Sequence, residues 1–361
     1  VFNSLFSENM LHSLKISIFY IRFGIFCILV NYLINIKKKF IYLFFYTLIA
    51  TMIFVSFDAY IQYFFGRNLL GMSPLEFPRI SGLFGDELIL GSYLSRLIPL
   101  SIGIFFLKKI DIKLILIFLV FIEVLIVITG ERTAIGLIGL STLFFILLLN
   151  GFKILRIISI FLVFILSALV FSQFSETKQR VIDHTFMELG TSSNKQVQIN
   201  FEGVKPIYKN YFLFSPKHQS LIITSYNMYK DKKLLGHGPR SFKYKCNDPK
   251  YQLNRWSCAS HPHNIVSQIL AEIGLVGIIF YLMIIIYLML FFYNHIFSKA
   301  LKKVDFDNYQ ICLIVSLILT IWPFFPSGNI FSNWLSIIFY LPIGFYLNSI
   351  NDYSNESNNR K

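Results

Sequence analysis

Long apolar stretches with almost no charged residues limit what this chain can fold into. The stretches 155–174 and 264–293 each contain a single charged residue, and about 20 apolar residues in a helix are enough to cross a bilayer core of roughly 30 Å. Charged residues make up 14% of the chain and its mean hydropathy is +0.61, whereas about a quarter of a typical soluble domain is charged. The sequence therefore predicts an all-α polytopic membrane protein, folded as a helical transmembrane bundle.

The apolar stretches divide into nine predicted spans. They cover about 15–36, 40–57, 86–107, 114–130, 133–150, 155–174, 264–293, 308–325 and 333–349. Basic residues gather in every second connection, which the positive-inside rule assigns to the cytoplasm. These residues are Lys37, Lys38, Lys39, Lys108, Lys109, Lys113, Lys153, Arg156, Lys299, Lys302 and Lys303. The other connections then face outward, and because the first residue is Val1 we make no prediction about a signal peptide.

The predicted spans organise the chain into four parts. Residues 1–174 form an N-terminal bundle of six spans with an outer loop at 58–85, and residues 264–350 form three C-terminal spans before a cytoplasmic tail at 351–361. Between them lies a large basic outer loop, 175–263, with 14 Lys and Arg residues against six acidic residues. We expect this loop to fold as a few helices. Its charge suits a phosphate-bearing lipid or glycan, or the head groups of membrane lipids, and nucleic acid is not expected as a partner.

Cysteine usage agrees with this topology. Cys27 and Cys312 lie inside predicted spans, where a thiol behaves as a small hydrophobic group. Cys246 and Cys258 lie twelve residues apart in the outer loop, where an oxidising compartment permits a disulfide. The sequence shows no CxxC pair and no metal-ligand spacing, so neither a metal nor a cofactor is predicted.

Charged residues inside a membrane span are unfavourable and usually face the protein interior. Arg96 and Glu123 both fall near the middle of their predicted spans, so each is a candidate partner for the other. The sequence leaves open whether such a buried pair is structural or takes part in chemistry.

Four arginines on separate outer segments are candidates for binding a diphosphate, because a planar guanidinium donates two hydrogen bonds at once. Arg132, in "TGERTAIG", stands where a predicted helix begins and offers backbone amides, although an arginine there also suits an interfacial anchor. Arg240 follows the glycine-rich "GHGP", which we expect to expose backbone amides. The other two are Arg180 and Arg79, and near Arg79 we expect Asp86 to cap the third span.

The segment "HPHN" stands at the mouth of the seventh span. His261 and His263 lie two residues apart, and histidine is the usual proton acceptor because its ordinary pKa is close to neutral pH. We expect Asn264 to cap the helix that begins at Ile265. From the residues alone, a catalytic histidine and an interfacial hydrogen-bonding histidine both remain open.

These motifs resemble, in the same order, those of the O-antigen ligase and polymerase family of bacterial surface-polysaccharide assembly. "RISGLFGDELILGSYL", "TGERTAIG" and "LLGHGPRSF" resemble its R-x-x-G-x-F, T-G-S-R and G-x-G-x-x-x-F elements. "HPHN" resembles its H-x-H-N element, and Glu272 opens the E-x-G-x-x-G pattern that follows it. The chain departs from the family at Asp86, where Asn or Pro is frequent, and at Glu131, where the residue is usually small and polar. The resemblance covers roughly residues 76–349.

The resemblance implies a metal-independent, inverting membrane glycosyltransferase with a GT-C-like fold, in the bacterial inner membrane and with its active site facing the periplasm. The implied donor is a glycan on undecaprenyl diphosphate, and the implied acceptor is a hydroxyl of a lipid A-core sugar. His263 would take the acceptor proton, and His261 would orient it or replace it. The residues assigned to the diphosphate are Arg132, Arg240, Arg79 and Arg180, and those assigned a supporting role are Asn264, Glu272 and Asp86.

Two other functions stay open at this point. A polymerase would use the same fold and leaving group to extend a carrier-linked repeat unit, and only the length of the outer loop and the H-x-H-N element favour the ligase. A flippase or transporter of lipid-linked sugars would need basic residues along a central path. The arginines and histidines here concentrate on the predicted outer face, which argues against transport.

Overall fold

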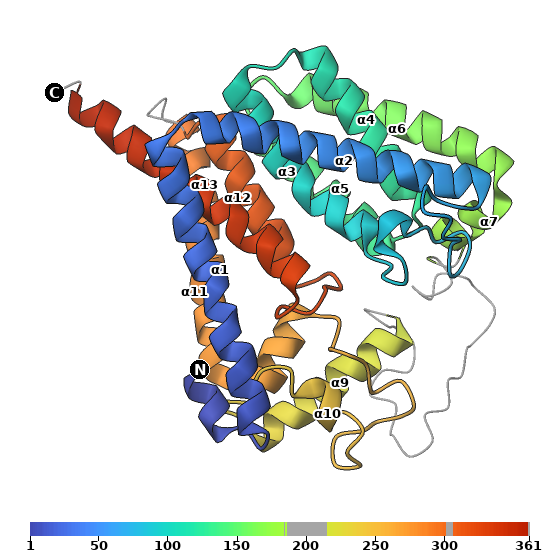
Figure 1. Cartoon of the computed structure of the whole chain (residues 1–361), viewed down its shortest axis with the longest axis vertical. Coiled ribbons are helices and arrows are strands. Elements are labelled where there is room, and N and C mark those ends of the chain that lie inside the picture. Colours follow the sequence, from blue (N-terminus) through green and yellow to red (C-terminus); the bar gives the residue numbers. More distant parts are fainter. Residues whose placement is uncertain (184, 186–214, 301–305, 360–361) are drawn as a thin grey trace. The chain divides into compact units, whose positions relative to one another are not determined.

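The protein is described by a computed structural model that covers residues 1–183, 185, 215–300 and 306–359 (Figure 1). Every regular element in this part of the chain is a helix, apart from one isolated bridge between Glu76 and Arg79. The prediction of an all-α fold is therefore confirmed. A large part of the predicted outer loop, 186–214, lies outside the described residues.

Each predicted span corresponds to a helix. These helices are α1 (Met10–Ile36), α2 (Lys39–Phe65), α3 (Leu90–Lys108), α4 (Ile112–Ile128), α5 (Arg132–Leu148), α6 (Lys153–Gln173), α11 (Ile265–Ala300), α12 (Asn308–Thr320) and α13 (Asn333–Asn359). Among the described residues, α1, α2, α3, α6 and most of α11 are long and apolar enough to cross a membrane, and α5 and α12 are shorter apolar helices.

The remaining helices lie before or between the helices named above. They are η1 (Phe2–Phe6), η2 (Gly82–Phe84), α7 (Ser175–Lys178), the π-helical turn η3 (Gln179–Asp183), α9 (Pro216–Asp231) and α10 (Phe242–Lys245). The last four lie in the segment predicted as a large outer loop, 175–263, which therefore contains helices as expected.

Two boundaries around the first outer loop differ from the prediction. Helix α2 continues eight residues past 57 to Phe65, because the carboxylate of Asp58 is buried and accepts a hydrogen bond from the Leu69 amide at 2.9 Å. Helix α3 begins at Leu90 and not at Asp86, which is exposed in the preceding turn. The connecting loop is therefore shorter at its start and longer at its end than the sequence suggests.

The described chain divides into two compact units. The loop unit comprises Val1–Ile25, Asp183–Met289 and Ile321–Ile337, and the bundle unit comprises Phe26–Ile182, Leu290–Thr320 and Ile338–Lys361. Helices α1, α11 and α13 contribute residues to both units. Each unit is described by itself below.

The bundle unit has its core at α12. Every residue of this helix from Tyr309 to Thr320 is buried, although the helix is only 13 residues long. Helix α3 packs closely against it: a Cβ atom at Gly103 would lie 2.9 Å from the Cβ atom of Cys312. The glycine thus allows the two backbones to approach, and close packing of small residues is the usual source of helix association in a membrane.

The buried ion pair in the bundle unit is not the predicted one. Glu123 pairs with Arg156, whose Nη1 donates to both carboxylate oxygens at 2.7 and 2.9 Å, while Arg96 instead donates to the carbonyl of Ser92 at 2.9 Å. The guanidinium of Arg156 also donates to the hydroxyl of Thr142. Arg156 was predicted to be a cytoplasmic topology signal, but its side chain is completely buried. Because both charged side chains are buried, each compensates the charge of the other, and neither is exposed to the membrane.

Candidate functional site

The "HPHN" segment leads directly into α11 in the loop unit. Asn264 accepts hydrogen bonds at Oδ1 from the backbone amide and the hydroxyl of Ser267, at 3.0 and 3.1 Å. Its amide nitrogen donates to the carbonyl of Pro323 at 2.7 Å. Asn264 therefore caps α11, as predicted, and also ties the helix start to the segment that precedes α13.

His261 has both ring nitrogens engaged. Its Nε2 donates to the carbonyl of Ser327 at 3.1 Å, so Nδ1 accepts from the hydroxyl of Ser260 at 3.0 Å. The side chain is 9% exposed, and burial lowers the pKa of His261 to about 4. These contacts fix one neutral tautomer, which suits an orienting role better than proton transfer.

His263 differs from its neighbour in its hydrogen bonding. No hydrogen bond of its ring nitrogens is found within the described part of the chain, and its ring lies 4.0 Å from that of His261, measured between centroids. Burial lowers the pKa of His263 to about 3, so its imidazole is neutral at pH 7 and holds an unshared electron pair. The ring is thus available to a hydroxyl group.

The backbone of His263 is held in an unusual conformation. Its φ is +55°, a value that side chains other than glycine rarely adopt. Its carbonyl accepts a hydrogen bond from the Ser327 amide at 2.9 Å, which holds the residue in this conformation. Such backbone conformations are concentrated at functional sites, because the surrounding structure must compensate for them. Arg240 shares this feature, with φ +58°.

A third histidine joins this cluster. The ring of His218, from the first turn of α9, lies 5.7 Å from that of His263, and its Nδ1 is 2.7 Å from the hydroxyl of Ser215. The sequence analysis missed it because 45 residues separate the two histidines and no local pattern connects them. Among the described residues, no group of histidine, cysteine or acidic side chains is arranged to hold a metal ion.

The glycine-rich segment before Arg240 has a structural role that the sequence did not suggest. Helix α11 breaks at Gly274, where φ is +72°. The amides of His237 and Gly238 donate to the carbonyls of Ala271 and Glu272 at 3.0 and 2.9 Å, which the break leaves without helical partners. The prediction that "GHGP" exposes these amides to a ligand is therefore wrong for both of them.

Close backbone contact explains why glycines stand on both sides of this crossing. A Cβ atom at Gly236 would lie 2.6 Å from the carbonyl carbon of Glu272, and one at Gly274 would lie 2.6 Å from the amide nitrogen of Gly236. No side chain fits at either position without moving the backbone. The glycines at 236 and 274 therefore allow the two backbones to pack directly against each other.

Glu272 and Arg240 belong to the two segments that meet at this crossing. Glu272 is fully buried and accepts hydrogen bonds from the Phe242 amide at 3.1 Å and from Gln268 at 3.0 Å. Arg240 donates to the carbonyl of Phe331 at 3.0 Å, while its buried Nε has no partner among the described residues. Glu272 thus supports the local structure. The Nε–H group of Arg240 is a hydrogen-bond donor without a partner among the described residues.

Two of the other predicted arginines meet in the bundle unit. Arg79 and Arg180 approach the carboxylate of Glu76 at 3.8 and 3.7 Å. The arginine side chains are 25% and 24% exposed, and that of Glu76 is 63% exposed. These long, open contacts contrast with the buried pair of the same unit, and they leave the cluster accessible.

The turn that precedes Arg132 lies close to Arg180 in space. It is the first residue of α5 and follows the turn at Gly130, where a Cβ atom would lie 3.0 Å from the Cδ atom of Arg180. Arg180 therefore packs over the turn that leads into Arg132. The bundle unit thus brings together Arg79, Arg180 and Arg132, whereas Arg240 belongs to the loop unit.

The loop that carries Arg79 is held by a residue that the sequence analysis overlooked. The side-chain oxygen of Gln62, buried in the last turn of α2, accepts hydrogen bonds from the amides of Ser81 and Gly82 at 3.0 and 2.8 Å. Gln62 therefore fixes the chain two residues after Arg79. An amide side chain in an apolar helix is the signal that could have indicated this role.

The cap of α3 comes from Glu131 and not from Asp86. The carboxylate of Glu131 accepts hydrogen bonds from the amides of Gly91 and Ser92 at 2.7 and 2.9 Å. Asp86 makes no such contact, because α3 begins four residues after it. The glutamate that departs from the family pattern thus neutralises the helix N-terminus.

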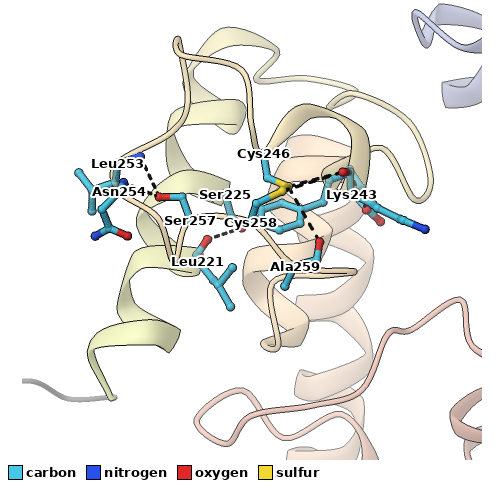
Figure 2. The surroundings of a disulfide bond; sticks show 11 residues. Leu221, Ser225, Lys243, Cys246, Leu253, Asn254, Ser257, Cys258 and Ala259 are labelled. Carbon is cyan, nitrogen blue, oxygen red and sulfur yellow. Dashed lines mark hydrogen bonds between the residues drawn. A yellow bond between two sulfur atoms is a disulfide. The ribbon is translucent and has the colours of Figure 1, made fainter. Parts of the chain in front are cut away.

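Cys246 and Cys258 form a disulfide in the loop unit (Figure 2). Their Cα atoms are 4.9 Å apart. The segment that this bond closes is held further by Ser257, whose hydroxyl accepts hydrogen bonds from the amides of Leu253 and Asn254 at 2.8 and 2.9 Å. The disulfide therefore shapes the chain immediately before "HPHN".

Comparison with known proteins shows that part of the chain matches a family model. The family model described as O-antigen ligase matches residues 115–282. The match includes the histidine cluster and Arg132, Arg180 and Arg240, and it begins after Arg79 and Asp86. No curated protein and no solved structure matches the chain.

Proposed function

We propose that the chain transfers a glycan from undecaprenyl diphosphate to a sugar hydroxyl. The premise is that it belongs to the O-antigen ligase and polymerase family, whose model matches residues 115–282. Members of this family are membrane enzymes of the glycosyltransferase type, and the apolar helices make this chain a multi-pass membrane protein. In the proposal the membrane is the bacterial inner membrane and the reaction takes place at its periplasmic face. The acceptor is a lipid A-core sugar.

One observation carries the chemical part of this proposal. His263 presents a neutral ring whose nitrogens are not engaged by the described protein, while the neighbouring ring of His261 has both nitrogens occupied. In the proposed reaction His263 accepts the proton of the acceptor hydroxyl. The hydroxyl oxygen bonds to the anomeric carbon, the bond from that carbon to the diphosphate oxygen breaks, and its electron pair leaves with the diphosphate. Direct displacement of this kind inverts the anomeric carbon.

The arginines support the second half of the proposal. Negative charge grows on the diphosphate as it leaves, and guanidinium groups can stabilise that charge without a metal ion. Arg79 and Arg180 approach the exposed carboxylate of Glu76 at long distances, 3.8 and 3.7 Å. A diphosphate with more negative charge than one carboxylate would replace Glu76 as their partner. Arg132 and Arg240 complete the proposed set.

Two alternatives remain as proposals of lower rank. A polymerase would use the same residues and would extend a lipid-linked repeat unit, so it differs only in the acceptor. A flippase would move the lipid-linked sugar without chemistry. The buried charges Arg156 and Glu123 compensate each other fully, so they provide no open charge for a central path, which argues against the flippase.

A transfer assay with the purified chain separates these functions. The donor is an undecaprenyl-diphosphate glycan in detergent, and the acceptors are lipid A-core and a second lipid-linked repeat unit. The proposal predicts glycan on lipid A-core, whereas extension of the repeat unit alone would identify the polymerase. Absence of any product with both acceptors, from protein that binds the donor, would support the flippase and contradict the proposal.

A further inference from the structure

The stretch that joins α12 to α13 along the chain, residues 321–332, contacts both histidines of the "HPHN" segment. We call it the connecting segment, and it consists of turns and irregular backbone. The carbonyl of Ser327 accepts a hydrogen bond from Nε2 of His261 at 3.1 Å, and the amide of Ser327 donates one to the carbonyl of His263 at 2.9 Å. The position of this segment therefore determines how one histidine ring and the backbone of the other are held.

The connecting segment also holds the arginine of the loop unit. The carbonyl of Phe331 accepts a hydrogen bond from a terminal nitrogen of Arg240 at 3.0 Å. Three residues of the proposed site thus depend on a segment without regular secondary structure. The backbone groups of such a segment need side-chain or water partners, because no helix or sheet supplies them.

Gln268, in the first turn of α11, supplies such a partner. Its side chain is fully buried, and its Oε1 accepts a hydrogen bond from the amide of Ile330 at 3.1 Å. Its Nε2 donates to Oδ1 of Asn329 at 2.9 Å, an oxygen that also accepts from the amide of Phe331 at 2.9 Å. Gln268 therefore holds the turn of the connecting segment that lies between Ser327 and the partner of Arg240.

The same side chain reaches a second stretch of the site. Nε2 of Gln268 also donates to Oε2 of Glu272 at 3.0 Å, and Oε1 of Glu272 accepts from the amide of Phe242 at 3.1 Å, two residues after Arg240. Both neighbours of Nε2 are acceptors and the neighbour of Oε1 is a donor, so the side-chain amide fits in one orientation. Gln268 thus connects the segment that orients the histidines with the stretch that carries the arginine.

Two hydroxyl groups share part of this task. Tyr20 and Ser336 both donate to the carbonyl of Ile330, each at 3.1 Å. They bind the carbonyl side of the turn, whereas Gln268 binds its amide and the side chain of Asn329. Without Gln268 that amide would lose its partner, which is unfavourable for a group shielded from water, so the turn would shift to find another.

We propose that Gln268 is a positioning residue for the transfer reaction: it holds the connecting segment so that Ser327 orients His261 and His263 and Phe331 retains Arg240. The inference rests on the proposed function, because a base and a diphosphate ligand must be held in register to act together. Gln268 itself acts only through other residues.

Hydrogen–deuterium exchange of the purified full chain in nanodiscs tests the holding role without any substrate. Gln268→Leu removes all three hydrogen bonds and should accelerate exchange in the peptides that cover 321–332, because local opening becomes easier. Asn329→Ala removes one of these bonds, leaves α11 unaltered and should show a smaller increase. This second variant serves if Gln268→Leu does not fold. Unchanged exchange in the variants that fold would overturn the proposal.

Initial rates of glycan transfer measure the consequence for the reaction. A misplaced catalytic group can reduce a rate about 100-fold, so Gln268→Leu should lower kcat about tenfold or more and change the KM for the donor less. Gln310→Leu is the matched control. Gln310 is also a buried glutamine, 6% exposed in α12, and its side chain donates to the carbonyl of Ser349 at 3.5 Å. This variant should retain kcat, and an equal loss in both leucine variants would overturn the proposal.

An exchange of two side chains separates positioning from a general loss of stability. Gln268→Glu alone sets two carboxylates at the 3.0 Å distance of the present hydrogen bond and should lower kcat. Adding Glu272→Gln restores a donor between the two positions and keeps acceptors for the amides of Ile330 and Phe242, so kcat should recover several-fold. A double variant no faster than Gln268→Glu would contradict the positioning role. Absence of transfer by the unaltered chain would instead contradict the proposed function, while hydrogen exchange would still decide whether Gln268 holds the segment.

Discussion

Two ion-pair systems of the bundle unit differ in almost every physical property. The side chains of Arg156 and Glu123 are both completely buried, with a shortest contact of 2.7 Å. Arg79 and Arg180 instead share the exposed Glu76, at 3.8 and 3.7 Å. A closed pair of this kind supports the fold, because each buried charge compensates the other. The open cluster is partly exposed to its surroundings.

The histidines repeat this contrast in the loop unit. Hydrogen bonds occupy both ring nitrogens of His261, whereas neither ring nitrogen of His263 has a partner among the described residues. Residue type and position in the sequence do not distinguish the two. The two histidines differ in their contacts with Ser327. The carbonyl of Ser327 accepts a hydrogen bond from the ring of His261, whereas the amide of Ser327 donates one to the backbone carbonyl of His263.

The largest expected effect comes from breaking the closed pair. Glu123→Ala leaves the buried Arg156 without a counter-charge, which should lower the free energy of unfolding by about 3–5 kcal/mol. Denaturant unfolding of the purified chain measures this value. The double variant Glu123→Leu with Arg156→Met should recover most of the loss, since it removes both charges together. A loss below about 1 kcal/mol in Glu123→Ala would show that the pair does not support the fold.

The open cluster should respond in the opposite way. Glu76→Ala should change the free energy of unfolding by about 1 kcal/mol or less, because its side chain is 63% exposed. Arg180→Lys and Arg132→Lys should instead reduce glycan transfer about tenfold or more, since an ammonium cannot make the bidentate contact of a guanidinium. Initial rates with the lipid-linked donor provide the measurement. Unchanged rates in both lysine variants would remove the diphosphate role of these arginines.

A separate effect should follow from pH. The folded chain holds His261 and His263 neutral, with pKa values of about 4 and 3, whereas an unfolded chain binds protons at these residues below about pH 6.5. The unfolded state therefore gains protons first as the pH falls, and stability should decrease from about pH 6.5 towards pH 4. Thermal unfolding at pH 7 and pH 5 should show a lower midpoint at pH 5. His261→Gln should reduce that difference, and an equal difference in this variant would contradict the assignment.

The sequence predicted the helical membrane fold well because apolar length alone determines it. Every predicted span has its helix, and errors are confined to boundaries such as that of α2, where Asp58 looked like the end of a span. Its carboxylate is in fact buried and bonded to the following loop. A polar residue that is compensated by a distant amide cannot be recognised from composition.

Prediction of the site was less complete for the same reason. Asn264 caps α11 as the local pattern indicated, but the partner of Glu123 and the cap of α3 both come from residues that lie far away in the sequence. The glycines of "GHGP" suggested a ligand site, although they serve to let the backbone meet α11 at Gly274. His218 lacked any sequence signal, since only the fold brings it to His263.

One measurement tests the central claim directly: the rate of glycan transfer by His263→Ala compared with His261→Gln, from protein that binds the donor normally. General-base catalysis contributes about 10²–10⁴-fold to a rate. The account therefore predicts that His263→Ala loses transfer by about 100-fold or more and that His261→Gln loses less, because His261 only orients its neighbour. Near-normal transfer by His263→Ala would show that the open imidazole is not the base and would contradict the account.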